Sequence, residues 1–334
     1  MIRRSLIKLA NPQLLALVGV LAINWLLFPS FFRVTWQDGR FFGSLIDVLN
    51  RGAPVAILAV GMVGVIATKG VDLSVGAVMA VAGAVAATLV VAGYPAPVAV
   101  AAALVVGLLC GIWNGVLVAV LDIQPIIATL VLMVAGRGIA QLITEGFIVT
   151  FTDPTLIFIG TGSFLGFPMA AVIALVLMIA VTLVVRRTAI GLFIEAVGVN
   201  RAAASLAGIR SRMLLILVYA LSGFCAAIAG IIVAGDIRGA DANNAGLWLE
   251  LDAILAVVIG GTSLLGGRFS VPLAVVGALI IQAMNTGILV SGFPPEFNLI
   301  VKAGLIFIVL VIQSPLATRL APVRLRRVAR SQAK

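Results

Sequence analysis

Long runs of apolar residues alternate with short polar segments along almost the whole chain. Runs of this kind are typical of helices that cross a bilayer, which takes about 20 residues when the helix is perpendicular to it. Several runs are shorter, so we expect broken, tilted or re-entrant helices among them. The ten predicted spans are residues 13–29, 53–68, 74–92, 96–121, 125–143, 168–186, 213–235, 251–265, 270–291 and 297–313.

The basic residues predict the orientation of these spans. Ten crossings place both termini on the same side of the membrane. Sixteen of the 22 basic residues fall on that side, in the two tails, at Lys69, at Arg268 and in the stretch 186–212. Because cytoplasmic loops collect Lys and Arg, we predict that both termini are cytoplasmic.

The composition agrees with a membrane protein. Hydrophobic residues make up 63% of the 334 residues and charged residues 10%, whereas soluble domains carry about 25% charged residues. The formal net charge of +10 does not indicate nucleic-acid binding, because no basic stripe is interleaved with aromatic residues. The predicted fold class is therefore an all-α membrane protein with about ten transmembrane helices.

Several kinds of chemistry are poorly supported. The chain has no histidine, and Cys110 and Cys225 both lie inside apolar runs, which weighs against a metal site or a disulfide scaffold. No nucleophile–base pair stands out, so we expect no catalytic residue, metal or cofactor in this chain. The phosphate-binding pattern G-x-x-x-x-G-K-[ST] is also missing, so any coupling to ATP requires another subunit.

The stretch 186–212 is the longest polar interruption, with five arginines and one acid, Glu195. Asn200 is placed to cap a short helix over 201–207, and Gly208 is placed to end it. One interpretation is a basic loop that is retained in the cytoplasm. The other is a docking surface, because Gly198, Gly208 and the alanines at 202–204 permit close approach by another protein.

A second polar interruption, Lys69 to Gly76, separates two apolar runs. Lys69 and Asp72 are close enough in sequence to neutralise each other, and Asp72 or Ser74 can cap the following helix. A tight, capped turn is the favoured interpretation. The alternative is a hinge in a discontinuous helix beside a transport pathway.

Polar side chains inside the spans are costly and need a reason. A sugar pathway would use amides to hydrogen-bond the hydroxyl groups of the sugar and an aromatic plane to lie against its ring. For any single residue, the favoured interpretation is instead a contact that holds helices together. For the set together, we expect at least one pathway residue. The candidates are Trp113, Asn114, Arg137, Gln141, Gln282, Asn285 and Thr286.

The segment 235–250 is predicted to lie outside the cytoplasm and is rich in acidic and amide side chains. A solvated loop is the default interpretation, and contact with a partner or a polar solute is the alternative. The residues that would make such a contact are Asp236, Arg238, Asp241, Asn243 and Asn244.

Three segments in this order, 70–76 (GVDLSVG), 195–203 (EAVGVNRAA) and 251–261 (LDAILAVVIGG), resemble the ribose-type permeases of bacterial ABC sugar importers. The resemblance extends from about Leu14 to Gln313. Two further segments, 235–250 and 291–296 (SGFPPE), resemble the galactofuranose-uptake permeases of that family.

The resemblance implies a single ten-helix permease domain over residues 1–334. Its parts would be a membrane core over 13–313, a cytoplasmic coupling loop over 187–212 and a basic cytoplasmic tail over 314–334. It also implies a multi-pass protein of the bacterial inner membrane, surrounded by lipid and without a nucleic-acid partner. The implied protein partners are a second permease subunit (a paralogue or an identical copy), ATP-binding cassette subunits that hold the ATP and Mg, and a periplasmic sugar-binding protein.

The resemblance further implies that residues 195–208 form a coupling helix seated in a groove of an ATP-binding subunit. The coupling residues would be Glu195, Gly198, Asn200, Arg201, Ala202, Ala203 and Gly208. The outer segment 235–250 would then meet the binding protein. The implied cargo is a furanose-form sugar, such as galactofuranose or arabinofuranose.

The alternative is a secondary sugar transporter driven by an ion gradient. Such a protein would normally carry a titratable carboxylate near the middle of the membrane. The carboxylates of this chain lie mainly at the ends of the predicted spans, which weighs against it.

Overall fold

The computed structural model describes residues 11–37, 39–292, 294, 297, 299–304 and 307. The chain divides into two compact units, residues 1–286 and 287–334, and the account below concerns the first. Of the predicted last span, 297–313, only residues 297, 299–304 and 307 are described, and the basic tail 314–334 lies wholly outside the described residues.

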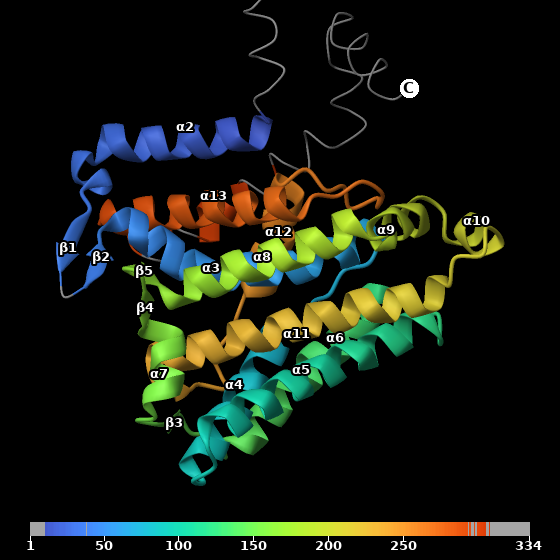
Figure 1. Cartoon of the computed structure of the whole chain (residues 1–334), viewed down its shortest axis with the longest axis horizontal. Coiled ribbons are helices and arrows are strands. Elements are labelled where there is room, and N and C mark those ends of the chain that lie inside the picture. The colour runs from blue at the N-terminus through green and yellow to red at the C-terminus, as the bar shows by residue number, and fades with distance from the viewer. Residues whose placement is uncertain are drawn as a thin grey trace, which may run out of the picture. The chain divides into compact units, whose positions relative to one another are not determined.

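The described part of the chain is mostly helical (Figure 1). Its helices are α2 (Pro12–Leu27), η1 (Pro29–Phe32), α3 (Ser44–Ala67), α4 (Val75–Val91), α5 (Ala96–Ala119), α6 (Pro125–Ile143), α7 (Pro154–Thr161), α8 (Met169–Arg187), α9 (Ile190–Val199), α10 (Arg201–Leu206), α11 (Ser211–Ile237), α12 (Leu249–Ile259) and α13 (Val271–Val290). Its strands are β1 (Thr35–Gln37), β2 (Arg40–Phe42), β3 (Val149–Thr150), β4 (Ser163–Phe164), β5 (Phe167–Pro168) and β6 (Gly239–Ala240).

Within the described residues, six helices are long and apolar enough to cross a membrane: α3, α5, α6, α8, α11 and α13. Seven of the predicted spans begin and end within two residues of an observed helix, namely α2, α4, α5, α6, α8, α11 and α13. The helical fold class is therefore confirmed. Ten crossings and cytoplasmic termini stay predictions.

Two helices differ from the prediction for local reasons. α3 begins at Ser44, nine residues before the predicted span, and its first turn carries Asp47, which the positive end of a helix favours. Hydropathy alone misses this polar beginning. α12 ends at Ile259 rather than at 265, because Gly261 has φ +92° and turns the backbone out of the helix.

α11 is the central helix and packs against α3, α4, α5 and α7. Its crossing with α5 is unusually close because glycines line it. A Cβ at Gly107 would collide with Ala227, and one at Gly111 would collide with the Tyr219 carbonyl. A Cβ at Gly115 would lie 2.7 Å from the Cα of Ile216. Small residues of this kind let membrane helices touch backbone to backbone.

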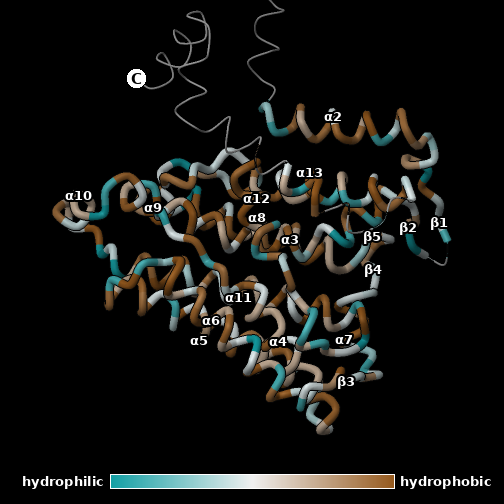
Figure 2. Tube along the Cα trace, turned by 180° about the vertical axis from the view of Figure 1, so that it is seen from behind, coloured by the Kyte–Doolittle hydropathy of each residue, from teal (hydrophilic) through white to brown (hydrophobic). Residues whose placement is uncertain are grey.

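The two ends of the first unit differ in structure (Figure 1). At one end lie α7 and three short antiparallel strand pairs, β1–β2, β3–β6 and β4–β5. At the other end lie α9 and α10. Hydrophilic positions gather at β1–β2 and beside α9–α10, whereas the helices between them are largely hydrophobic (Figure 2).

Candidate coupling and transport site

The break between α3 and α4 lies in the middle of the helix packing. Asp72 and Ser74 are each only 1% exposed. The N–H of Ser74 donates to Asp72 Oδ1 at 3.0 Å, and the Ser74 hydroxyl donates to the same oxygen at 2.6 Å. The predicted turn is therefore present. Asp72 holds the start of α4, while the Ser74 hydroxyl turns to Asp72 rather than capping the helix.

Asp72 also joins the break to two distant helices. The Ser222 hydroxyl of α11 donates to Asp72 Oδ2 at 2.8 Å. From α5, the Asn114 amide donates to the Ser74 hydroxyl at 2.8 Å and approaches Asp72 Oδ1 at 3.5 Å. We call Asp72, Ser74, Asn114 and Ser222 the Asp72 cluster. Every donor to this carboxylate among the described residues is neutral, and the cluster connects α4, α5 and α11.

The Asp72 cluster was only partly predictable. Asn114 was predicted as a pathway residue, and the structure places it against the break, with a fully buried side chain. Ser222 was missed, because a single serine in an apolar run gives no sign of what it faces. Thr129 of α6 was missed for the same reason. Its hydroxyl accepts the Leu73 N–H at 3.2 Å.

Lys69 does not pair with Asp72, contrary to the sequence-based expectation. Its ammonium is exposed and donates to the carbonyl of Val199, at the end of α9, at 3.0 Å. The two side chains separate because the backbone of Lys69 is left-handed, with φ 64°, and Asp72 turns into the protein interior. Lys69 therefore ties the α3–α4 break to the stretch 190–208, which we call the coupling stretch.

The coupling stretch has the local structure that its sequence predicts. The Asn200 side chain accepts the N–H of Ala203 at 3.0 Å and caps α10. Gly208 follows that helix with φ +87°. Ala202 and Ala203 are exposed, and the Leu206 side chain is 91% exposed. α10 thus presents a small, apolar outer face.

Gly198 contributes to internal packing rather than to this outer face. A Cβ there would collide with the carbonyl of Ala67 and would lie 2.8 Å from the nitrogen of Gly267. The N–H of Gly267 donates to the same Ala67 carbonyl at 2.9 Å. Gly198 therefore seats α9 on the end of α3, and Glu195 is part-buried one turn earlier.

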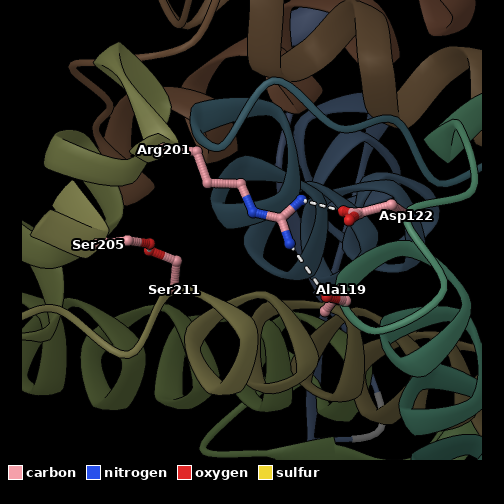
Figure 3. A network of polar contacts seen from close by, with 5 residues as sticks. All are labelled: Ala119, Asp122, Arg201, Ser205 and Ser211. Carbon is pink, nitrogen blue, oxygen red and sulfur yellow. Dashed lines mark hydrogen bonds and ion pairs between the residues drawn. The ribbon is translucent and has the colours of Figure 1, made fainter. Parts of the chain in front are cut away.

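Arg201 anchors α10 to the end of α5 (Figure 3). Its guanidinium forms an ion pair with Asp122 at 2.9 Å and donates to the carbonyl of Ala119 at 3.0 Å. The hydroxyls of Ser205 and Ser211 lie 2.8 Å apart across the turn that follows α10. α10 is thus held at its beginning and at its end.

Arg137 and Gln141, predicted as pathway residues, hold a loop in this structure. Arg137 donates to the carbonyls of Ala242 and Ala245 at 3.0 and 2.7 Å, and Gln141 donates to the Asn243 side chain at 2.7 Å. Their spacing on one face of α6 was recognised, whereas their partners lie about one hundred residues further along the chain.

The remaining pathway candidates point in different directions. Trp113 is 56% exposed on the outside of α5, while its neighbour Asn114 is buried. On α13, Gln282, Asn285 and Thr286 are all buried on one face and contact one another at 3.4 and 3.5 Å. The predicted shared face of α13 is confirmed. Trp113 does not lie with the amides.

The predicted outer segment has its own internal order. Asp241 accepts the N–H groups of Asn243 and Asn244 at 3.0 and 3.1 Å and the Asn244 amide at 2.8 Å. These bonds, led by that of the Asn244 side chain, hold the pKa of Asp241 below its usual value. Arg238 ends α11 in the left-handed conformation, and Asp236 is exposed beside it. The Asn243 side chain is engaged with Gln141 and that of Asn244 with Asp241, whereas Asp236 and Arg238 are exposed beside them.

Comparison with known proteins gives a consistent assignment. Residues 44–310 match the family described as "Branched-chain amino acid transport system / permease component". The galactofuranose transporter permease protein YtfT of Escherichia coli K12 is 63% identical over 303 residues, which cover 91% of this chain and 89% of that protein. No solved structure matches the chain.

Two further relatives are named for other sugars. The fructose import permease protein FruF of Bifidobacterium longum is 42% identical, over 91% of this chain and 87% of that protein. The ribose import permease protein RbsC of Escherichia coli K12 is 39% identical, over 90% of this chain and 92% of that protein. With its apolar helices and this match over most of its length, the chain is a multi-pass membrane protein that belongs to this family of permease components.

Proposed function

We propose that the chain is the permease subunit of an ATP-driven, binding-protein-dependent importer of a furanose-form sugar, with galactofuranose as the first candidate. The relatives named above are permeases for galactofuranose, fructose and ribose. All three sugars adopt five-membered rings, and the highest of these identities is to the galactofuranose permease. The competing secondary transporter is not favoured by any of these relatives.

The observation that carries this proposal is α10. It is capped by Asn200, anchored through Arg201 and exposed over Ala202, Ala203 and Leu206. A short helix that is fixed at its base and apolar on its outer face suits a groove on an ATP-binding subunit. ATP and Mg would be held by that subunit, and this chain would carry no catalytic group or cofactor.

The contacts also suggest a route for the movement. The coupling stretch contacts the α3–α4 break twice, through Lys69 to Val199 and through Gly198 to Ala67. When the ATP-binding subunits close, a displacement of α10 would therefore pass through α9 to the end of α3 and to the break before α4. The sequence-based expectation named spans 168–186 and 213–235, which are the chain neighbours of the loop. The α3–α4 break, which is remote from the loop in sequence, would also receive the movement.

The two ends of the first unit support the proposed orientation. The end that holds α9 and α10 carries Arg187 at the end of α8, Arg201 in α10, and Arg210 and Arg212 at the beginning of α11. Lys69 bonds to Val199 at the same end. By the positive-inside rule this end would face the cytoplasm of a bacterial inner membrane. The opposite end, with the segment 235–250, would face the periplasmic binding protein. The second permease subunit would complete the pathway.

The test is uptake and ATP hydrolysis by the assembled importer with Ala203→Trp. We expect the variant to insert normally but to lose sugar uptake, and to lose the stimulation of ATP hydrolysis by sugar-loaded binding protein. Ala92→Trp is the matched control, since Ala92 is an exposed alanine at the end of α4. Wild-type uptake by Ala203→Trp would contradict the assignment, and so would sugar accumulation by this chain alone on an ion gradient.

A further inference from the structure

Two recesses follow each other along the seam between α8 and α13. The first has a volume of about 320 Å³ and is lined almost wholly by apolar side chains. α3 contributes Leu49 and Ala56, α8 contributes Leu175 and Met178, and α13 contributes Leu279. A wholly apolar recess among membrane helices suits a hydrocarbon chain, because it offers no group that a polar solute could bond.

The second recess, of about 330 Å³, has a different character. α8 contributes Thr182 and Arg186, α9 contributes Glu195, and the beginning of α13 contributes Ser270 and Pro272. On α8 the apolar recess ends at Met178, and the polar one begins at Thr182, one helical turn later. The same two helices therefore carry an apolar recess and then a polar one.

The polar recess is lined by charges of both signs. Neither Arg186 nor Glu195 has a hydrogen-bond or ion-pair partner among the described residues. The hydroxyl of Thr182 is buried without a hydrogen-bond partner in that same part of the chain. In addition, the positive end of the α13 dipole lies beside Ser270. The recess therefore offers donors to an anion and one carboxylate to a cation.

The polar recess lies about one leaflet away from the near part of the apolar recess, which continues along α8 to Phe167. From Arg186 back to Leu175 is eleven residues, or about 16 Å along the helix axis. That is about half of the hydrocarbon thickness of roughly 30 Å. A headgroup held at Arg186 would therefore place its acyl chain beside Leu175 and Met178, near the middle of the membrane.

We propose that the α8–α13 seam binds one phospholipid with a phosphoethanolamine headgroup. Its phosphate meets Arg186, Thr182 and the beginning of α13, its ammonium meets Glu195, and one acyl chain enters the near part of the apolar recess, at Met178 and Leu175. This inference rests on the membrane location of the chain and stands whichever solute the permease carries. Because α9 contributes Glu195, the bound lipid stabilises the junction between α8 and the coupling stretch.

The test is native mass spectrometry of the full chain, purified in mild detergent and supplied with either dioleoyl phosphatidylethanolamine or dioleoyl phosphatidylglycerol. We expect the wild type to retain one phosphatidylethanolamine about tenfold more tightly than phosphatidylglycerol, which is about 1.4 kcal/mol. Glu195→Gln should remove that preference, because both lipids keep the phosphate and only one carries the ammonium. Arg186→Gln should weaken both lipids.

Two matched controls separate this site from general lipid contact. Arg187→Gln changes the neighbouring arginine, which does not line the recess, and should leave retention unchanged. Met178→Trp should fill the apolar recess and release both lipids, whereas Leu183→Trp, on the exposed side of α8, should not. Thermal melting of each variant, with Arg186→Lys as a rescue, identifies any variant that fails to fold.

Three results would overturn the proposal. The first is equal retention of both lipids by the wild type and all variants, which would indicate only adventitious lipid. The second is full competition by water-soluble glycerophosphoethanolamine, which would show that the apolar recess takes no part. The third is a wild-type dimer that Met178→Trp separates into monomers, which would show that a second copy of this chain covers the seam.

Discussion

The Asp72 cluster and the Arg201 contact both connect α5 to a distant segment, but they do so in opposite surroundings. In the cluster, Asp72 and Asn114 are at most 1% exposed, and the carboxylate accepts hydrogen bonds from neutral donors. In the Arg201 contact, the side chains of Arg201 and Asp122 are 38% and 67% exposed and carry opposite charges. A buried polar group is costly to separate from its partners, whereas an exposed ion pair exchanges readily with water. The first contact therefore fixes the fold, and the second can be remade as α10 moves.

The largest expected effect comes from Asp72→Ala. The change removes the acceptor for Ser222 and Ser74 and leaves Ser222 buried without its bond, so we expect a loss of about 3 kcal/mol in the free energy of unfolding. Thermal unfolding in detergent would measure it. Asp72→Asn, which keeps one acceptor oxygen, should lose less. If both variants melt like the wild type, the cluster does not fix the fold.

A smaller effect is expected from Gly198→Ala, at the seat of α9 on α3. The added Cβ collides with the Ala67 carbonyl, and overpacking of this kind costs about 1–3 kcal/mol. We expect a lower melting temperature together with weaker stimulation of the partner ATPase. Gly138→Ala on α6 is the control, because a Cβ there meets nothing within 4 Å. Equal behaviour of the two variants would show that α9 is not seated through Gly198.

The smallest effect is expected from Asp122→Asn. Exposed ion pairs contribute at most about 1 kcal/mol, so the melting temperature should barely change at low salt and not at all at high salt. Sugar uptake should fall even where the melting temperature is unchanged, because the anchor of α10 is weakened. A loss of stability as large as that of Asp72→Ala would remove the contrast between the two regions.

The sequence predicted helices better than it predicted partners. α6 was predicted over 125–143, as observed, because Pro125 begins it and its apolar run is unbroken. The cap of α10 was predicted because Asn200 acts on an N–H only three residues away. By contrast, Ser222 and Asp72 are 150 residues apart, and hydropathy carries no information about which face of α11 meets the break.

The same limit explains the contacts that the sequence did not predict for other candidate residues. Arg137 and Gln141 were recognised as costly polar groups in a span, but the loop that they hold lies beyond the reach of any local pattern. Gly198 was expected from the sequence to permit a close approach, and the structure shows one. The approach is to α3 rather than to another protein, and this depends on how α9 packs against α3.

The glycine-lined crossing of α5 and α11 has a consequence for how the protein is made. Gly111 meets Tyr219, which is about one hundred residues later in the chain, so α5 enters the membrane well before its partner is synthesised. At 5–20 residues per second, that delay is roughly 5–20 s. During that interval the glycine-lined face of α5 is without its partner. The close α5–α11 crossing can therefore form only after α11 has been synthesised, late in the insertion of the chain.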